Sequence, residues 1–291
     1  MFTGSIVALV TPMDQQGRLD MSALRRLVDF HLENGTSGLV VAGTTGESAT
    51  LGGDEFIELL GAVSGQVAGA IPVIAGTGTA DTSKSVAMTR RAAELNADAV
   101  LVVTPYYNRP TQAGLAAHYR AIADSSSIPV IMYNVPSRTG TDLLPETALA
   151  LADHPAIAGI KEAVADMERV RRLVEESPED FCVLSGDDGS CAQAMLLGAS
   201  GVVSVAANIV PDMMSALCRA AIAGEKAETE TLEASLRELF RVLGIESNPI
   251  PAKWALQQMG LIGPGIRLPL QVLNARHHDA VRACLQKLKQ I

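Results

Sequence analysis

Eight short and almost wholly apolar segments constrain the fold of this chain more than any other feature of its sequence. They are rich in valine, isoleucine, leucine and alanine and lie at residues 5–10, 38–43, 72–76, 99–104, 129–134, 157–161, 181–186 and 201–205. Apolar and polar residues do not alternate in them, so each segment suits a strand covered on both faces, as in a parallel sheet. Helical patterns lie between them, for example at residues 21–35, 54–69 and 82–97. This order predicts a series of βαβ units.

Eight βαβ units favour a (β/α)₈ TIM barrel, a fold that typically needs about 250 residues. The alternative is a doubly wound open sheet, which a G-x-G-x-x-G turn after the first strand would favour. The sequence VTPMDQQG stands there instead. We therefore predict an α/β protein with a catalytic barrel at residues 1–224 and an all-helical C-terminal domain at residues 225–291. Helical patterns at 227–244 and 278–290 define that domain, and we interpret the polar stretch ESNPIPAKW (246–254) as a loop.

The charge and the cysteine pattern argue against several classes of protein. The net charge is −9, and no basic stripe marks a nucleic-acid interface. No segment approaches the roughly 18 to 20 apolar residues of a membrane span, and the N-terminus lacks the basic region of a signal peptide. The four cysteines and five histidines show no metal-ligand spacing, so we expect neither a disulfide framework nor a metal or other cofactor. These features predict a soluble cytoplasmic protein without a nucleic-acid or membrane partner.

Candidate functional residues lie where the apolar segments end, because the active site of a barrel lies at the C-terminal ends of its strands. They are Thr11, GTTGE (43–47), GTG (76–78), TPYYN (104–108), YNVPSR (133–138), Lys161 with Glu162, and SGDD (185–188). Glu47, Asp187 and Asp188 are interpreted as caps or loop formers. Lys161 is more informative, since it closes the apolar run AIAGIK. A lysine at a strand end is ordinarily solvated, whereas a neutral amine in a pocket poor in water can attack a ketone and form an imine.

The other rim residues supply what an imine mechanism requires, and they favour the nucleophile over the solvated strand end. Arg138 offers a planar fork that matches a carboxylate. Thr44 and Thr45 lie in a turn flanked by glycine, where hydroxyl and N–H groups can face a small anion. Tyr133 can act as a general acid–base, or equally as a core tyrosine whose hydroxyl is hydrogen-bonded. We predict that Lys161 forms a covalent imine with its substrate.

Six motifs, in order along the chain, carry a resemblance to a known family. They are GTTGES, VTPYYNRP, YNVPSRTG, GIKEA, LSGDD and ESNPIPAKWAL, within a likeness that runs from FTGSIVALVTP to GIRLPL. Together they resemble the 4-hydroxy-tetrahydrodipicolinate synthase (dihydrodipicolinate synthase) family of pyruvate-dependent class I aldolases. The resemblance implies a TIM barrel with a helical C-terminal domain, assembled as a homotetramer (a dimer of dimers). It also implies condensation of pyruvate with L-aspartate-4-semialdehyde, the first committed step of lysine and diaminopimelate biosynthesis.

The resemblance further implies roles for individual residues. Lys161 forms the imine with pyruvate. Tyr133, Thr44 and Tyr107 form a proton relay, in which Tyr107 reaches the site across a subunit interface. The substrate-binding positions are Thr45 for the pyruvate carboxylate, Arg138 for the carboxylate of the semialdehyde, and Gly186 and the backbone of Val203 for the lining of the pocket.

Regulation by lysine is the point at which this sequence departs from part of the family. In relatives that lysine inhibits, the resemblance places an effector site at a dimer interface. Three of its positions are kept, and they are Ser48, Ala49 and Tyr106. Four others, where inhibited enzymes carry polar or acidic groups, are Gly53, Phe56, Ala80 and Lys84. Lys84 would repel the ammonium group of lysine, so we expect weak or absent inhibition.

A sister aldolase, such as N-acetylneuraminate lyase or a 2-keto-3-deoxy sugar-acid aldolase, is the alternative function. The imine chemistry is common to all of these enzymes, but a long polyhydroxy substrate needs hydroxyl partners at the second-substrate site. Arg138 suits a short anionic aldehyde better. A non-catalytic relative would have lost Lys161 or Tyr133, and both are present.

Overall fold

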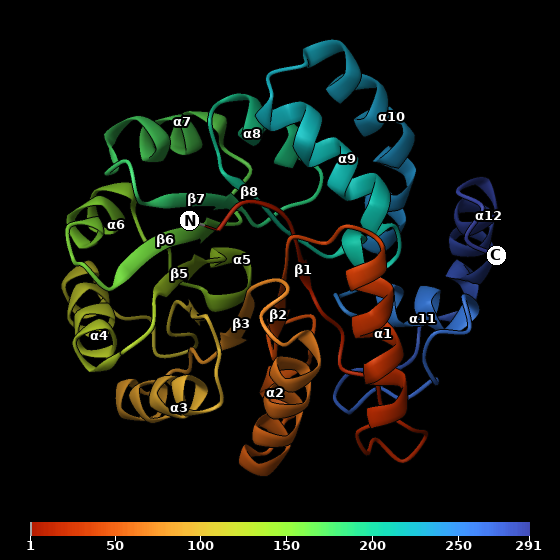
Figure 1. Ribbon diagram of the computed structural model, residues 1–291, viewed down its shortest axis with the longest axis horizontal. Coiled ribbons are helices and arrows are strands. Elements are labelled where there is room, and N and C mark those ends of the chain that lie inside the picture. Colours follow the sequence, from red (N-terminus) through yellow and green to blue (C-terminus); the bar gives the residue numbers. More distant parts are fainter. Residues whose placement is uncertain (1) are drawn as a thin grey trace.

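Eight parallel strands close into a barrel, and a ring of helices surrounds it (Figure 1). The computed structural model describes residues 2–291. Each strand pairs in parallel with the next one along the chain, and the last pairs with the first. The strands are β1 (Gly4–Ala8), β2 (Gly38–Val41), β3 (Val73–Gly76), β4 (Ala99–Val103), β5 (Val130–Asn134), β6 (Ile157–Glu162), β7 (Cys182–Ser185) and β8 (Gly201–Ser204). The predicted TIM barrel is confirmed, and the open sheet is excluded.

Helices follow every strand and return the chain to the start of the next one. They are α1 (Met21–Glu33), α2 (Gly53–Val67), α3 (Thr82–Glu94), α4 (Gln112–Ser125), α5 (Pro136–Thr139), α6 (Pro145–Ala152), α7 (Met167–Glu176), α8 (Cys191–Leu196) and α9 (Pro211–Ile222), with the short 3₁₀ turns η1 (Ser48–Thr50) and η2 (Ala206–Asn208). Asp20, Asp81 and Asp166 cap α1, α3 and α7 by accepting hydrogen bonds from N–H groups of the first turn. Such caps satisfy donors that a helix start leaves unpaired.

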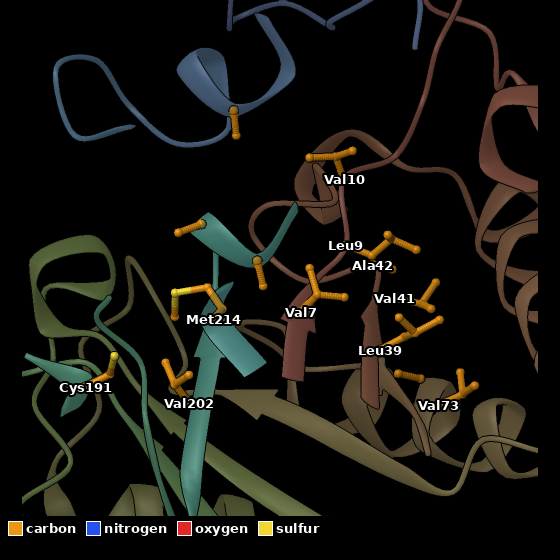
Figure 2. Packing of buried hydrophobic residues seen from close by; sticks show 14 of the residues in the cluster. Val7, Leu9, Val10, Leu39, Val41, Ala42, Val73, Cys191, Val202 and Met214 are labelled. Carbon is orange, nitrogen blue, oxygen red and sulfur yellow. The ribbon is translucent and has the colours of Figure 1, made fainter. Parts of the chain in front are cut away.

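The alternation of side chains along each strand divides the core into two layers. Ile6 and Ala8 of β1 belong to an apolar cluster inside the barrel, whereas Val7 and Leu9 belong to the layer between strands and helices. Figure 2 shows part of this outer layer, to which β1, β2 and α9 contribute Val7, Leu39 and Met214 among others. Both faces of each strand are therefore buried, which is the arrangement that continuous apolar segments predict.

Three further helices follow α9 and pack at one side of the barrel (Figure 1). They are α10 (Lys226–Leu243), α11 (Ile250–Gln258) and α12 (His278–Lys287), the last preceded by the 3₁₀ turn η3 (Ala275–His277). Helix α10 packs on α9 and α12, and α11 also contacts η2 at the rim of the barrel. The boundary predicted between residues 224 and 225 falls in the turn before α10, and the division into two domains stays a prediction.

The stretch ESNPIPAKW (246–254) differs from its predicted loop. Helix α11 begins inside it at Ile250, with Pro251 in the first turn. A proline is tolerated there because its missing N–H would have no partner inside the helix anyway. Trp254 and the two residues after it are buried. Two prolines that looked like loop markers therefore flank the start of a helix.

Candidate active site

Lys161 and Tyr133 are neighbours at the C-terminal ends of β6 and β5. The two strands pair so that these residues lie opposite each other. Tyr133 belongs to the cluster inside the barrel, whereas Ile160 belongs to the outer layer; because successive side chains alternate, Lys161 points inward. Its amine lies 4.2 Å from the centre of the Tyr133 ring, and the residue is only 6% exposed. Lys161 is a buried amine beside a phenol, not a solvated strand end.

The end of β7 leaves room for this amine. A Cβ atom on Gly186 would lie 3.1 Å from Cε of Lys161 and 2.8 Å from Cβ of Ala163. Any larger residue at that position would therefore crowd the lysine. Val203 of β8 is buried in the inner cluster with Tyr133. The structure thus places two of the predicted pocket residues around the interior face that carries Lys161.

A buried charged network lies on the opposite side of β6 from Lys161. Glu162 accepts hydrogen bonds from Nδ2 of Asn134 at 3.0 Å and from Nε of Arg169 at 2.8 Å. Arg169 also pairs with Asp142 at 2.8 Å. Burial raises the pKa of Glu162, and the charge of Arg169 opposes this rise. The network ties the ends of β5 and β6 together, and so fixes the backbone from which Lys161 projects.

Thr44 and Thr45 lie in the turn after β2, which is held from two sides. Thr45 is buried and Thr44 half-buried. Oγ1 of Thr11, at the end of β1, donates to the carbonyl oxygen of Gly46 at 2.7 Å. Nδ2 of Asn248, in the C-terminal region, donates to Oγ1 of Thr45 at 2.9 Å. The two threonine hydroxyls therefore lie in a turn whose position is fixed by distant parts of the chain.

The same turn ends in a buried ion pair between Glu47 and Lys253 of α11. These residues are 4% and 5% exposed. The backbone N–H of Arg267 also donates to Oε2 of Glu47, at 3.0 Å. Burial lowers the pKa of Lys253, and the Glu47 carboxylate opposes this shift. Glu47 anchors the turn to the C-terminal region, which agrees with its interpretation as a loop former.

The acidic pair after β7 also acts locally. Oδ2 of Asp188 accepts from the backbone N–H groups of Val205 and Ala206, at 3.1 and 2.8 Å. Asp187 accepts from the hydroxyl of Ser190 at 2.6 Å. Burial raises the pKa of Asp188. The two carboxyl groups shape the loops that follow β7 and β8, as their interpretation as loop formers expects.

Tyr107 and Arg138 differ from these buried groups, because both are exposed. Tyr107 follows β4, is 93% exposed and has a backbone φ of 72°, and the neighbouring Tyr106 is 41% exposed. Arg138 lies in the short helix α5 after β5 and is exposed. Within residues 2–291 its guanidinium group has no hydrogen-bond partner, so the fork is free to take an anion. The phenol of Tyr107 has few neighbours within one copy of the chain.

The positions expected to form an effector site are spread over surface and core. Ser48, Ala49 and Lys84 are exposed. Phe56 is 5% exposed and packs in the outer core layer instead. It therefore offers an effector neither an accessible surface nor a polar group.

Asn248 and Lys253 were not identified from the sequence. They contact Thr45 and Glu47 across 203 and 206 residues of chain, and no local pattern connects segments so far apart. The one available signal was their membership of the ESNPIPAKWAL motif, which carried the resemblance. The partnership of Glu162 with Arg169 was missed for a different reason: the two residues are only seven positions apart, but the pairing depends on how the loop after β6 leads into α7.

Within residues 2–291 no three histidine, cysteine, aspartate or glutamate side chains gather as a metal site would require. The four cysteines are free and buried. No helix of the described part is long and apolar enough to cross a membrane.

The sequence model of the dihydrodipicolinate synthetase family matches residues 1–288. The chain belongs to this family. The resemblance seen in the motifs is therefore confirmed. A curated relative, the 4-hydroxy-tetrahydrodipicolinate synthase of Ectopseudomonas mendocina, is 53% identical over 287 residues, which cover 99% of this chain and 98% of the relative.

Solved structures of dihydrodipicolinate synthases share the whole fold. The chloride-inhibited enzyme of Acinetobacter baumannii, in complex with pyruvate, matches with a TM-score of 0.99 and 46% identity and covers 100% of both chains. A monomeric variant of the enzyme matches with a TM-score of 0.97 and 41% identity over 100% of this chain and 98% of its own. The family likeness therefore includes the barrel and the three helices after it.

Proposed function

We propose that this chain is a lyase that condenses pyruvate with L-aspartate-4-semialdehyde through an imine on Lys161. The product is (4S)-4-hydroxy-2,3,4,5-tetrahydrodipicolinate, which makes the reaction the first committed step of lysine and diaminopimelate biosynthesis in the cytoplasm. The single observation that carries the proposal is the amine of Lys161, buried inside the barrel mouth against Tyr133. Membership of the family and the name of its curated relatives support the choice of substrates.

The chemistry needs no cofactor. The Lys161 amine attacks the keto carbon of pyruvate, and the carbonyl oxygen leaves as water when the imine forms. Loss of a methyl proton turns the imine into an enamine, whose carbon attacks the aldehyde of the second substrate. The amino group of that substrate then attacks the imine carbon, closes the ring and releases Lys161. Each step moves protons, so positioned acids and bases are required.

The rim residues divide this work between them. Tyr133, next to the amine, passes protons to and from the reacting atoms, together with Thr44 and with Tyr107 of a second copy of the chain. Thr45 holds the pyruvate carboxylate, and the free fork of Arg138 takes the carboxylate of the semialdehyde. Gly186 and the backbone at Val203 line the pocket.

A homotetramer, built as a dimer of dimers, is the assembly we propose. Its support is the pair of adjacent tyrosines after β4, Tyr106 and Tyr107, which are large and exposed in one copy. A monomeric variant exists among the solved relatives, so the assembly of this chain needs its own measurement. Sedimentation equilibrium would show four copies, and a mass of one copy would contradict the proposal.

We also propose that lysine inhibits this chain weakly or not at all, because of the residues at the positions expected to form the effector site. Lys84 is exposed and carries the charge of the effector's own ammonium group, while Phe56 is buried. Steady-state assays should show little loss of rate as lysine is added. Half-inhibition at well below millimolar lysine would contradict this.

The function is tested by a substrate comparison on purified protein. Pyruvate is offered with aspartate-4-semialdehyde and separately with N-acetylmannosamine, and the imine is trapped on pyruvate alone with borohydride and located by mass spectrometry. We expect turnover only with the semialdehyde, and a reduced pyruvate adduct on Lys161. Lys161→Ala should form no adduct and lose about a thousandfold or more in turnover.

Lys287→Ala is the matched control, because Lys287 is exposed at the end of α12. It should form the adduct and turn over as the unchanged chain does. Turnover with the sugar would indicate a sister aldolase, and would leave Arg138 without its proposed partner. An adduct that persists in Lys161→Ala would contradict the mechanism.

A further inference from the structure

Asn248 reaches the barrel from the segment that joins α10 to α11. Its Nδ2 donates to Oγ1 of Thr45 at 2.9 Å. Its Oδ1 is buried and finds no hydrogen-bond partner in the part of the chain that the structure describes. The only hydrogen bond of the Asn248 side chain in the described part of the chain therefore goes to the Thr45 hydroxyl, at the rim of the barrel.

Another asparagine of the same region behaves in the ordinary way. Oδ1 of Asn274 accepts from the backbone N–H of Arg276 at 3.1 Å and so shapes its own turn. Asparagine is favoured in loops because of such local bonds. Asn248 makes none, and a buried acceptor without a partner is unfavourable for stability. Local structure and stability therefore do not account for an asparagine at residue 248.

The contact has a direct consequence for the Thr45 hydroxyl. A hydroxyl group can donate one hydrogen bond and accept two. Because Asn248 supplies a donor, Oγ1 of Thr45 acts as the acceptor in this pair, and its own proton stays available. Thr45 is 2% exposed, so bulk water does not compete freely for that proton. A carboxylate, which only accepts, is the complementary partner.

We propose that Asn248 is a positioning residue that turns the Thr45 hydroxyl into a donor toward the carboxylate of the bound keto acid. The inference rests on the proposed function, in which Thr45 holds that carboxylate. It gives the C-terminal helical region a part in substrate binding that goes beyond packing. Lys253 and Arg267 fix the backbone of the same turn through Glu47, whereas Asn248 sets the direction of one hydrogen bond.

Two substitutions of Asn248 test the direction of this bond. Asn248→Ala removes the donor, and Asn248→Asp keeps the shape but can only accept, so it would take the Thr45 proton for itself. Both should raise the KM for pyruvate about ten- to hundredfold, as expected when a hydrogen bond to a charged group is lost. The KM for the semialdehyde should change less than about twofold. Borohydride trapping at increasing pyruvate concentration should rank the apparent pyruvate affinities of the variants in the same order, without the second substrate.

A double-mutant cycle separates positioning from mere structural support. In a Thr45→Val background, Asn248→Ala should raise the KM for pyruvate no further, because the hydroxyl on which it acts is gone. Asn274→Ala is the matched control and should leave both KM values unchanged. Thermal unfolding of each variant shows whether the fold is kept.

Three outcomes would overturn the proposal. The KM for pyruvate could stay within about twofold in both Asn248 variants, the two single effects could simply add in the cycle, or both KM values could rise together with a loss of thermal stability. The unchanged chain serves as the separate test of the proposed function. If it forms no pyruvate adduct on Lys161, the proposed function fails; if it does and Asn248→Ala behaves normally, only the role of Asn248 fails.

Discussion

The turns after β2 and β4 each carry a proposed proton-relay residue, Thr44 and Tyr107, but they are held in different ways. The β2 turn is buried and tied to the C-terminal region by Asn248 and by the Glu47–Lys253 ion pair. The β4 turn leaves its tyrosine 93% exposed. The contacts that hold the β2 turn therefore lie within one copy of the chain. The β4 turn instead presents the Tyr107 phenol outward, away from that copy.

The backbone of the β4 turn is nevertheless well defined. Tyr107 and Arg109 both have positive φ values, 72° and 48°, which is unfavourable by about 1–3 kcal/mol for residues other than glycine. Hydrogen bonds to other segments hold this turn. The backbone N–H of Tyr107 donates to the Thr139 carbonyl at 3.4 Å, Nδ2 of Asn108 donates to the Ala80 carbonyl at 2.9 Å, and Nε of Arg109 donates to the Gly140 carbonyl at 3.0 Å. We therefore expect the direction in which Tyr107 points to matter for its proposed role in the proton relay.

The largest expected effect on stability comes from breaking the buried pair of the β2 turn. Lys253→Met leaves the Glu47 carboxylate buried without its partner, and we expect a loss of about 3–5 kcal/mol in the free energy of unfolding. Arg241→Met is the matched control, because Arg241 pairs with Glu238 at a surface where the side chains are 58% and 43% exposed. Arg241→Met should change the free energy of unfolding much less than Lys253→Met does, because water and salt screen an exposed pair. Denaturant unfolding measures both, and equal losses would contradict the difference between buried and exposed pairs.

A smaller and pH-dependent effect is expected at Glu55, which pairs with Arg267 beside the same turn. The hydrogen bonds from Arg267 lower the pKa of Glu55 to about 2. Since the folded pKa lies below the unfolded one, the pair stabilises the fold fully above about pH 4.5 and loses this effect as the pH falls toward 2. Glu55→Gln should cost about 1 kcal/mol at pH 7, because the pair is partly exposed and screened.

The direction of this pH dependence is tested by measuring the free energy of unfolding of the unchanged chain and of Glu55→Gln from pH 7 down to pH 3. The stability difference between the unchanged chain and Glu55→Gln should narrow as the pH falls. A difference that stays constant, or grows, would show that the charge of Glu55 is not what stabilises the fold.

The smallest effect on stability is expected at the β4 turn. Tyr107→Phe removes only an exposed hydroxyl and should change the free energy of unfolding by less than about 0.5 kcal/mol, yet it should lower turnover if the phenol belongs to a relay. Mixing it with Lys161→Ala tests whether the relay acts between copies. If Tyr107 acts in the partner's site, a dimer of one Tyr107→Phe and one Lys161→Ala copy has one complete site of its two. Because about half of the dimers formed on random mixing are of this kind, roughly a quarter of full activity should return in an isologous dimer. No recovery on mixing would place Tyr107 in its own copy's site.

Much of the barrel was predictable because its signals are local. Each strand is buried on both faces, so its sequence is apolar without alternation, as at residues 99–104. The rim could be located because parallel strands all end at the same face, which brings Lys161 and Tyr133 together although they are 28 positions apart. The chemistry of an amine, a phenol and a guanidinium then indicated an imine mechanism, and the family resemblance supplied its substrates.

The contacts that hold the site could not be predicted in the same way. Lys253 and Glu47 are ordinary charged residues in the sequence, and only the packing of α11 on the rim makes them a buried pair. Helix α11 itself was interpreted as part of a loop, because proline marks the start of a helix as readily as a turn. The exposure of Tyr107 likewise follows from the path of its turn and not from its neighbours in the sequence.

The sequence by itself determined the barrel and the position of Lys161 at its mouth, and it predicted the type of reaction, since burial on two faces and reactive side chains at strand ends leave local signals. Tertiary structure decided which groups fix that mouth. Asn248 and Lys253 reach it across more than 200 residues, and the energy of such contacts depends on burial and direction, which arise only when the C-terminal helices pack on the barrel.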